Sequence, residues 1–249
     1  MTMEGTAPLF RCERTARIIS LLSGASRWIL LSHTKPDGDT LGCGSALWST
    51  GRSQGKDVVW GGPDPVPDSY LFLAGTDGFL PGLTLGSLSL DRDTVVVALD
   101  TSTAARSVAD LSGIPEGVPL VNMDHHHDNE GFGTAVWVDP TSSSVGEMCW
   151  MLLRNWGIPI PPEAAEALYT AIVTDCGNFA FSCTTPRTHQ AAADLLSLGV
   201  APEKIDQLIR CSRTMEGLRL RGRALERVRS VGSFAAVTWI GKTDFQDTG

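Results

Sequence analysis

A run of three histidines after an aspartate is the feature of this sequence best suited to chemistry. The run is Asp124-His125-His126-His127, in a chain that has only five histidines. Imidazole and carboxylate groups are ligands for divalent metal ions, and a histidine-rich turn after an apolar segment is typical of a ligand cluster. A solvated surface turn is the alternative interpretation.

A second cluster of the same kind lies in the segment 33–39. It contains His33, Asp37 and Asp39, with Gly38 between the two carboxylates. A Pro-Asp-Gly sequence is also common in ordinary turns. For a metal loop, the two carboxylates have to point in different directions, and we expect Gly38 to permit the sharp turn between them.

Two further aspartates, Asp100 and Asp175, stand at the ends of apolar segments. Asp100 follows the apolar run 94–99, and Asp175 follows the helical segment 163–174. A carboxylate at a helix C-terminus meets the negative end of the helix dipole, so a nearby cation would explain its presence. The alternatives are a strand-end cap for Asp100 and an exposed helix end for Asp175.

A parallel sheet is the element that can bring these residues together. Short continuous apolar runs predict strands at 28–31, 58–60, 94–99 and 118–123, and an edge strand at 135–138. Helical stretches between strands predict an α/β fold, with a parallel sheet flanked by helices. Ligands of such sheets bind beyond the carboxyl ends of the strands, where His33, Asp100 and Asp124 stand.

Helical patterns dominate the second half of the chain. In the first half of the chain, apolar periodicity predicts helices only at 15–22 and 40–50. From Ser143 onward, it predicts helices at 144–155, 163–174, 185–198, 203–211 and 215–229. Residues 234–240 return to strand character.

Composition excludes several classes of protein. The chain has 249 residues with a net charge of −8, which argues against a grip on duplex nucleic acid. No apolar run approaches the ~18 residues that span a bilayer, and the N-terminus is unlike a signal peptide. The six cysteines include no CxxC pair and are typical of reduced thiols in a cytoplasmic protein. The oligomeric state is left open.

The four motifs, in this order, resemble those of DHH-family phosphoesterases, and in particular the RecJ-like oligoribonuclease and pAp-phosphatase subgroup. The resemblance covers roughly residues 12–240. Further residues match the same pattern: Thr101, Ser102 and Arg106; Asn122, Met123 and Asn129; Asp139, Pro140, Ser143, Ser144 and Glu147; and Thr184 to His189.

The resemblance implies a pair of metal ions and a ligand set. One ion would bind His33, Asp37 and Asp100. The other would bind Asp39, Asp100, His125 and Asp175, so that Asp100 bridges. Mixed oxygen and imidazole ligands suit Mn²⁺, and Mg²⁺ is compatible with them. Two such ions lie about 3.5–4 Å apart in phosphoesterases.

Three residues are assigned catalytic roles by the same resemblance. His126 would contact the phosphate or protonate the leaving oxygen, and Asp124 would orient a histidine. Arg106 would contact the phosphate, with an ordinary surface arginine as the alternative. His127 occupies a variable place in the family pattern and is interpreted as a bystander.

The implied activity is hydrolysis of a phosphoester in a small nucleotide: a short single-stranded oligoribonucleotide, pApA or pAp. One alternative is a manganese-dependent inorganic pyrophosphatase, which usually has threonine where Gly38 stands. The other is a non-catalytic nucleotide-binding regulatory protein on the same scaffold, which would be expected to lack metal ligands.

The expected domain organisation has three parts. Residues 12–200 would form the DHH phosphoesterase domain, and 201–230 a helical linker. Residues 231–249 would begin an incomplete C-terminal substrate-binding domain, because 234–240 resembles the first strand of that domain. Oligoribonuclease-type relatives carry a Gly-Gly-Gly-His motif there, and this sequence has none.

Overall fold

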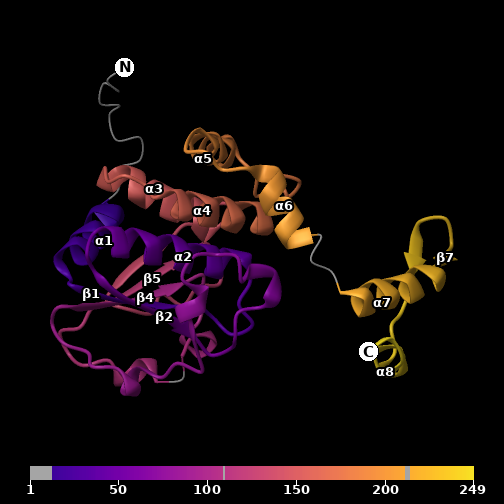
Figure 1. Cartoon of the computed structure of the whole chain (residues 1–249), viewed down its shortest axis with the longest axis horizontal. Helices are drawn as coiled ribbons and strands as arrows, with labels where there is room; N and C mark the ends of the chain where they lie inside the picture. The colour runs from indigo at the N-terminus through magenta and orange to yellow at the C-terminus, as the bar shows by residue number, and fades with distance from the viewer. Residues whose placement is uncertain (1–12, 109, 211–213) are drawn as a thin grey trace. The chain divides into compact units, whose positions relative to one another are not determined.

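The computed structural model describes residues 13–108, 110–210 and 214–249 (Figure 1). Contacts divide the chain into two compact units, one ending at Ile205 and the other spanning Asp206–Gly249. The second unit thus contains most of the predicted linker, 201–230, and all of the predicted start of a second domain, 231–249. The domain boundaries given in the sequence analysis stay a prediction. In the described residues, no helix has the length and apolarity needed to cross a bilayer.

Six parallel strands form the sheet of the first unit, in the order β3-β2-β1-β4-β5-β6. Every residue of β4 is buried, as its continuous apolar run predicts. The chain builds outward from β1 in one direction and from β4 in the other, so the sheet has a switch point between these two strands. The strands are β1 (Arg27–Leu31), β2 (Asp57–Gly62), β3 (Leu80–Pro81), β4 (Thr94–Leu99), β5 (Leu120–Asp124) and β6 (Ala135–Val138).

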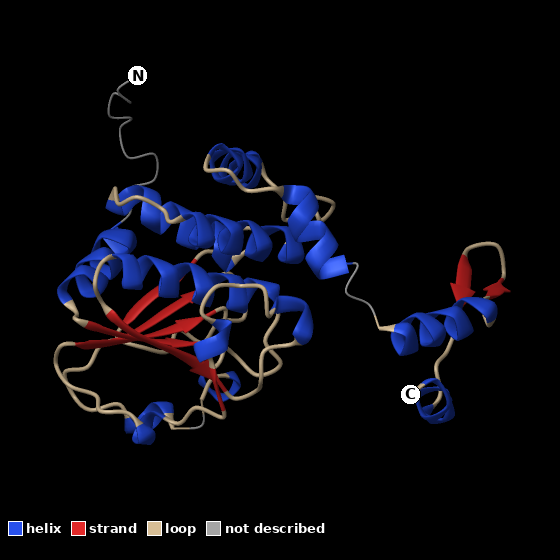
Figure 2. Ribbon diagram, viewed as in Figure 1, coloured by secondary structure: helices blue, strands red, loops and turns tan. Residues whose placement is uncertain are grey.

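The helix α2 (Gly38–Ser53) lies against one face of the sheet, and α4 (Pro162–Asp175) packs on the outer side of α2 (Figure 2). A Cβ atom at Gly42 would lie 2.5 Å from the carbonyl oxygen of Ala167, so glycine is required for this close approach. This unit also contains α1 (Glu13–Gly24), α3 (Val145–Trp156) and α5 (Pro186–Ser197), and α6 (Pro202–Arg210) begins in it and continues past its last residue, Ile205.

The opposite face of the sheet is covered by loops with short 3₁₀ turns. Ile29 and Val96 belong to a buried cluster with Leu83, Leu85 and Val118, which come from these loops. The predicted α/β fold with a parallel sheet flanked by helices is confirmed. The two-residue strand β3 was not predicted, because a strand of that length leaves no periodic signal.

The second unit contains α7 (Met215–Glu226), a hairpin of β7 (Arg229–Val231) and β8 (Ala235–Val237), and α8 (Lys242–Thr248). The predicted helix 215–229 is wrong at its end, because Arg229 pairs with Val237 in the hairpin. The predicted strand 234–240 is shorter, and α8 was not predicted. Position 211, the end of another predicted helix, lies outside the described residues.

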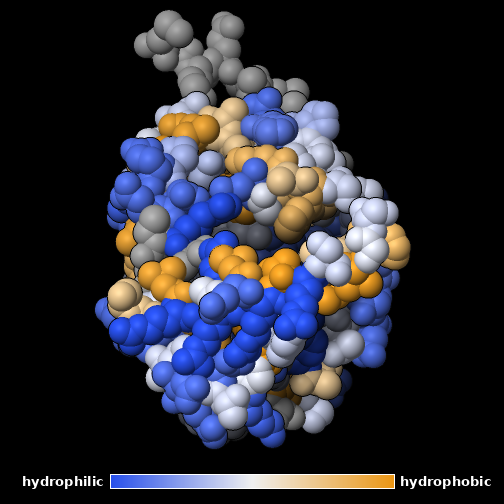
Figure 3. Space-filling view, turned by 90° about the vertical axis from the view of Figure 1, so that its right-hand side faces the viewer, coloured by the Kyte–Doolittle hydropathy of each residue, from blue (hydrophilic) through white to orange (hydrophobic). Residues whose placement is uncertain are grey.

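Two arginines hold Asp244 at the start of α8. The Nη2 atom of Arg227 lies 2.7 Å from Oδ1 of Asp244, and the Nη1 atom of Arg223 lies 3.3 Å from the same oxygen. Large apolar side chains of this unit remain exposed, including Phe234 and Leu225. Figure 3 shows hydrophobic residues at the protein surface beside hydrophilic ones.

Candidate metal centre

The predicted site residues converge at the carboxyl edge of the sheet, around its switch point. His33 lies just beyond β1, Asp100 directly follows β4, and Asp124 ends β5. The helices supply the others: Asp37 caps the N-terminus of α2 by accepting from the backbone N–H groups of Asp39 and Thr40, Asp39 lies in its first turn, and Asp175 ends α4.

The first metal position is defined here by His33, Asp37 and Asp100, whose ligand atoms lie within 4.8 Å of one another. The Nε2 atom of His33 is 3.3 Å from Oδ2 of Asp100 and 3.7 Å from Oδ1 of Asp37. The Nδ1 atom of His33 lies 2.7 Å from the carbonyl oxygen of Thr34. An N–H at Nδ1 that donates to this carbonyl leaves Nε2 as the ligand atom.

The second metal position is defined by Asp39, His125 and Asp175, which also lie within 4.8 Å of one another. The Nε2 atom of His125 is 3.4 Å from Oδ2 of Asp175 and 3.9 Å from Oδ2 of Asp39. It is also 3.7 Å from Oδ1 of Asp100. Asp100 therefore turns one oxygen toward each position, as a bridging ligand requires.

The conformation of Asp100 is itself unusual. Its φ is +56°, in the left-handed region that few residues other than glycine occupy. Its Oδ1 atom is buried and has no hydrogen-bond partner among the described residues. A buried carboxylate oxygen without a donor is costly. Two divalent cations would satisfy it, so the residues present fit a metal pair.

The electrostatics of the cluster indicate an excess of negative charge. Burial raises the pKa of Asp39 well above its usual value, and the charges of Asp100 and Asp175 raise it further. The pKa of Asp175 is raised to about 6, mainly by burial. Burial lowers the pKa of His33, but hydrogen bonds to Asp100 and Asp37 outweigh it and raise the value to about 10. Bound cations would relieve this charge.

His126 stands beside the metal positions and is held by Asp124. Its Nδ1 atom lies 2.7 Å from Oδ1 of Asp124 and 3.5 Å from Oδ1 of Asp100. The hydrogen bond to Asp124 is the largest cause that raises the pKa of His126, to about 8. Asp124 is fully buried, and the side-chain amide of Asn129 donates to its other oxygen at 2.6 Å. Asp124 is thus placed to orient His126.

His126 also forms a possible metal-binding group with Asp100 and His125. Because Asp124 takes up its Nδ1 atom at the shorter distance, we retain the prediction that His126 is not a ligand. His127 is exposed.

Arg106 lies on the loop after β4 and is partly buried. Its carbonyl oxygen accepts a hydrogen bond from the backbone N–H of Thr34 at 2.8 Å, which ties this loop to the segment after β1. Its charge lowers the pKa of His126, so the two side chains are electrostatically close. Among the described residues, its guanidinium group makes no ion pair.

Tyr70 is a neighbour of the site that the sequence analysis missed. Burial and the charge of Asp37 raise the pKa of its hydroxyl, and the nearby backbone of Gly38 lowers it. Tyr70 belongs to a short 3₁₀ turn, Asp68–Tyr70, after β2. No spacing in the sequence connects it to the histidine and aspartate motifs.

The expected role of Gly38 is wrong. Gly38 is the first residue of α2 and is not among the glycines with positive φ; the left-handed residue in this segment is Lys35, with φ of +51°. A Cβ atom at Gly38 would lie 2.3 Å from the Oγ1 atom of Thr174. Glycine is required here by the packing of α2 against α4.

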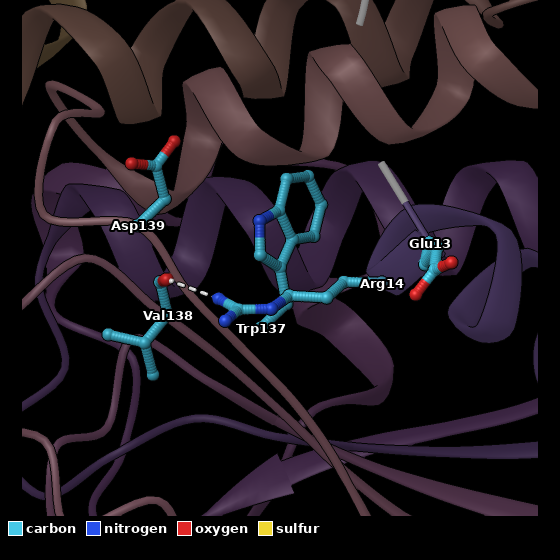
Figure 4. Close-up of a pocket in the computed structure, with 5 residues that line it drawn as sticks. All are labelled: Glu13, Arg14, Trp137, Val138 and Asp139. Carbon is cyan, nitrogen blue, oxygen red and sulfur yellow. Dashed lines mark hydrogen bonds between the residues drawn. The ribbon is translucent and has the colours of Figure 1, made fainter. Parts of the chain in front are cut away.

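A shallow hollow of about 410 Å³ lies elsewhere, between α1 and β6 (Figure 4). Glu13, Arg14, Trp137, Val138 and Asp139 line it, and Arg14 donates to the carbonyl oxygen of Val138 at 3.2 Å. None of its lining residues belongs to either metal position.

Several proteins of known name or structure resemble this chain, and three of them follow. It is 30% identical to the bifunctional oligoribonuclease and PAP phosphatase NrnA of Thermus thermophilus over 91% of this chain and 67% of that protein. The protein of the same name from Bacillus subtilis is 32% identical over 68% of this chain and 52% of its own length. An exopolyphosphatase-related protein from Bacteroides fragilis has the same fold, with a TM-score of 0.86, 22% identity, and coverage of 98% of this chain and 74% of that one.

The family model for the N-terminal domain of the DHH family matches residues 27–172. This span holds every residue of the candidate centre except Asp175. Because the match covers more than half of the chain, it confirms the resemblance found in the motifs: the protein belongs to the DHH family.

Proposed function

We propose that this protein is a two-metal hydrolase that cleaves phosphoesters in small nucleotides. The observation that carries the proposal is the pair of three-residue groups joined by Asp100, whose buried oxygen lacks a donor. When bound, two divalent ions lower the pKa of an attacking water and neutralise charge on the phosphate. The oxygen and imidazole ligands favour Mn²⁺, with Mg²⁺ as a weaker substitute.

The side chain of His126 supplies a proton to the leaving oxygen. With a pKa of about 8, its imidazole is mostly protonated at neutral pH. Asp124 holds the Nδ1 atom, so Nε2 is the nitrogen left to face the substrate. Arg106, whose guanidinium has no ion-pair partner among the described residues, contributes a positive charge that binds the phosphate.

The proposed substrates are short oligoribonucleotides, pApA and pAp. The names of the Thermus and Bacillus relatives include oligoribonuclease and PAP phosphatase activity. Every residue that the family resemblance implies as a metal ligand is present in this sequence. The net charge of −8 disfavours binding to long duplexes. Four cysteines in the described residues, Cys43, Cys149, Cys176 and Cys183, are free thiols, which supports a reducing compartment such as the cytoplasm.

A substrate panel tests the proposal. The purified protein is incubated with Mn²⁺ and with pAp, pApA, a short RNA, a cyclic dinucleotide or pyrophosphate. We expect turnover of at least one linear nucleotide and little of pyrophosphate. Asp100→Asn, purified in parallel, controls for contaminating phosphatases. Pyrophosphate as the sole substrate would support the pyrophosphatase alternative. A folded protein that hydrolyses none of these substrates would support the regulatory one.

A further inference from the structure

The segment 139–147, between β6 and the first turn of α3, contacts two residues of the second metal position. The carbonyl oxygen of Ser142 lies 3.3 Å from the Nδ1 atom of His125. The backbone N–H groups of Val145 and Gly146 donate to the two carboxylate oxygens of Asp39, at 2.7 and 2.8 Å. This one segment therefore fixes the orientation of both side chains.

Each contact has a direct consequence for metal binding. An N–H at Nδ1 of His125 that donates to Ser142 selects the tautomer in which Nε2 is free to bind a cation. Asp39 accepts two N–H groups at the positive end of α3, one on each carboxylate oxygen, and these bonds fix the orientation of the carboxylate. Both contacts hold the ligand atoms in the orientation that the second metal position requires.

The segment is anchored by a buried ion pair that the catalytic mechanism does not use. Glu147 is fully buried, and the Nε atom of Arg187, at the start of α5, donates to its Oε1 atom. The hydroxyls of Ser143 and Thr188 both donate to the Oε2 atom of Glu147 at 2.7 Å. The carboxylate is therefore fully partnered despite its burial.

The same guanidinium group also reaches the loop that carries the Ser142 carbonyl. Its Nη2 atom donates to the hydroxyl of Ser142 at 3.0 Å and lies 3.4 Å from Oδ2 of Asp139. Ser142 in turn donates to Asp139 at 2.9 Å. The guanidinium group of Arg187 thus joins Glu147 in α3 to Ser142 in the loop. Lysine, with one nitrogen, cannot do both.

We propose that Arg187 and Glu147 are positioning residues that determine occupancy of the second metal position, by holding the segment 139–147 against His125 and Asp39. Among the described residues, His33, Asp37 and Asp100 make no hydrogen bond or ion pair with this segment, so the affinity of the first metal position should be independent of the pair. The inference rests on the proposed two-metal centre.

Titration with Mn²⁺ alone tests the proposal, by calorimetry and by the electron paramagnetic resonance signal of a coupled Mn²⁺ pair. In Arg187→Gln, we expect the first ion to bind as in the wild type and the second to bind about 10–100-fold more weakly, the usual effect of losing an outer contact to a ligand. The coupled signal should appear only at higher Mn²⁺ concentration. Arg187→Lys should fall between the two.

Arg154→Gln is the matched control. Arg154 and Asp194 form an ion pair between the same two helices, α3 and α5, with 3.5 Å between Nε and Oδ2. Neither residue touches the segment 139–147, so both ions should bind normally. Should Arg187→Gln fail to fold, the double variant Arg187→Gln/Glu147→Gln removes both buried charges together and keeps hydrogen-bonding groups.

Unchanged affinity for both ions in a folded Arg187 variant would overturn the inference. Equal weakening of both ions, or weakening by Arg154→Gln as well, would overturn it too, because the effect would then be a general loosening of the helices. A wild-type protein that does not bind two Mn²⁺ ions would overturn the two-metal function itself, so the two failures are distinguishable.

Discussion

The ligands of the two metal positions are distributed differently along the sequence. The first takes His33 and Asp37 from one short segment and adds Asp100 from the neighbouring strand. The second takes Asp39, His125 and Asp175 from three separate elements. The side chain of Asp37 is 57% exposed, whereas that of Asp39 is fully buried. The first position thus depends on local geometry, and the second depends on how the helices pack.

Removal of metal abolishes the function of both positions together and has the largest expected effect. We expect excess EDTA to eliminate hydrolysis and added Mn²⁺ to restore it more fully than Mg²⁺, because the ligands are oxygen and imidazole atoms. Hydrolysis rates at matched free metal concentrations provide the measurement. Full activity in EDTA, in a protein that elemental analysis shows to contain no metal, would refute the two-metal model.

Asp100→Asn acts on the one residue that the two positions share. Asparagine tolerates the left-handed conformation at φ of +56°, so the fold should survive. Loss of a charge between two cations should lower kcat/KM by about three orders of magnitude, or roughly 4 kcal/mol. Circular dichroism checks the fold, and a folded variant with near-normal turnover and both metals would show that Asp100 is only a strand-end residue.

Replacement of the adjacent histidines separates a ligand from its neighbour. His125→Ala should lose the ion of the second position and retain that of the first. His126→Ala should retain both ions and lose about 10²–10⁴-fold in kcat, the usual contribution of a general acid. Metal stoichiometry of the two variants is the deciding measurement. Loss of an ion from both would place His126 among the ligands, as its grouping with Asp100 and His125 allows.

The smallest expected effect is on the melting temperature of the metal-free protein when a single carboxylate is replaced by an amide. It tests whether the carboxylates of the two metal positions differ in burial. The pKa of Asp175 is raised to about 6, so its ionised form opposes folding. The folded state holds a proton on Asp175 that the unfolded state releases near pH 3.8. The free energy of unfolding therefore falls as the pH rises from that value through about 6. Metal-free Asp175→Asn should therefore melt higher than the wild type at pH 7, by about 2–4 °C for each kcal/mol gained.

Asp37→Asn provides the contrast. The pKa of Asp37 is lowered, since hydrogen bonding with His33 outweighs the effect of burial, so its ionised form stabilises the fold. Thermal melting at pH 4 and pH 7 should show no stabilisation of this variant at the higher pH. A gain in stability equal to that of Asp175→Asn would mean that the two positions do not differ in the metal-free state.

Strand positions and the convergence of the site were predictable, for a local reason. The runs 95–99 and 135–138 are apolar throughout, and polar residues follow where these strands end. The carboxyl edge of a parallel sheet then brings His33, Asp100 and Asp124 together. Their roles as ligands or catalysts remain predictions that the experiments above test.

Contacts between distant segments were not predictable in the same way. The hydrogen bond between His125 and Ser142 is accepted by the backbone carbonyl of Ser142. Every residue has such a carbonyl, so the sequence does not indicate which one accepts. Tyr70 reaches Gly38 across 32 positions of the sequence. The helix α8 has a Gly241 N-cap and an Asp244 that accepts from the Gly241 backbone N–H at 2.7 Å, and its seven residues are too few for a periodic pattern.

The contact between positions 38 and 174 constrains how this loop can change during evolution. A side chain at Gly38 would overlap the hydroxyl and methyl groups of Thr174, at 2.3 and 2.6 Å. A larger residue at position 38 is therefore compatible only with a smaller residue, or a shifted helix, at position 174. If position 38 changed first, the new side chain would have to displace Thr174 or its helix, so the order without a clash is a change at position 174 followed by one at position 38. Exchange of loop sequences between branches of this family should consequently fail unless the facing helix is exchanged with them.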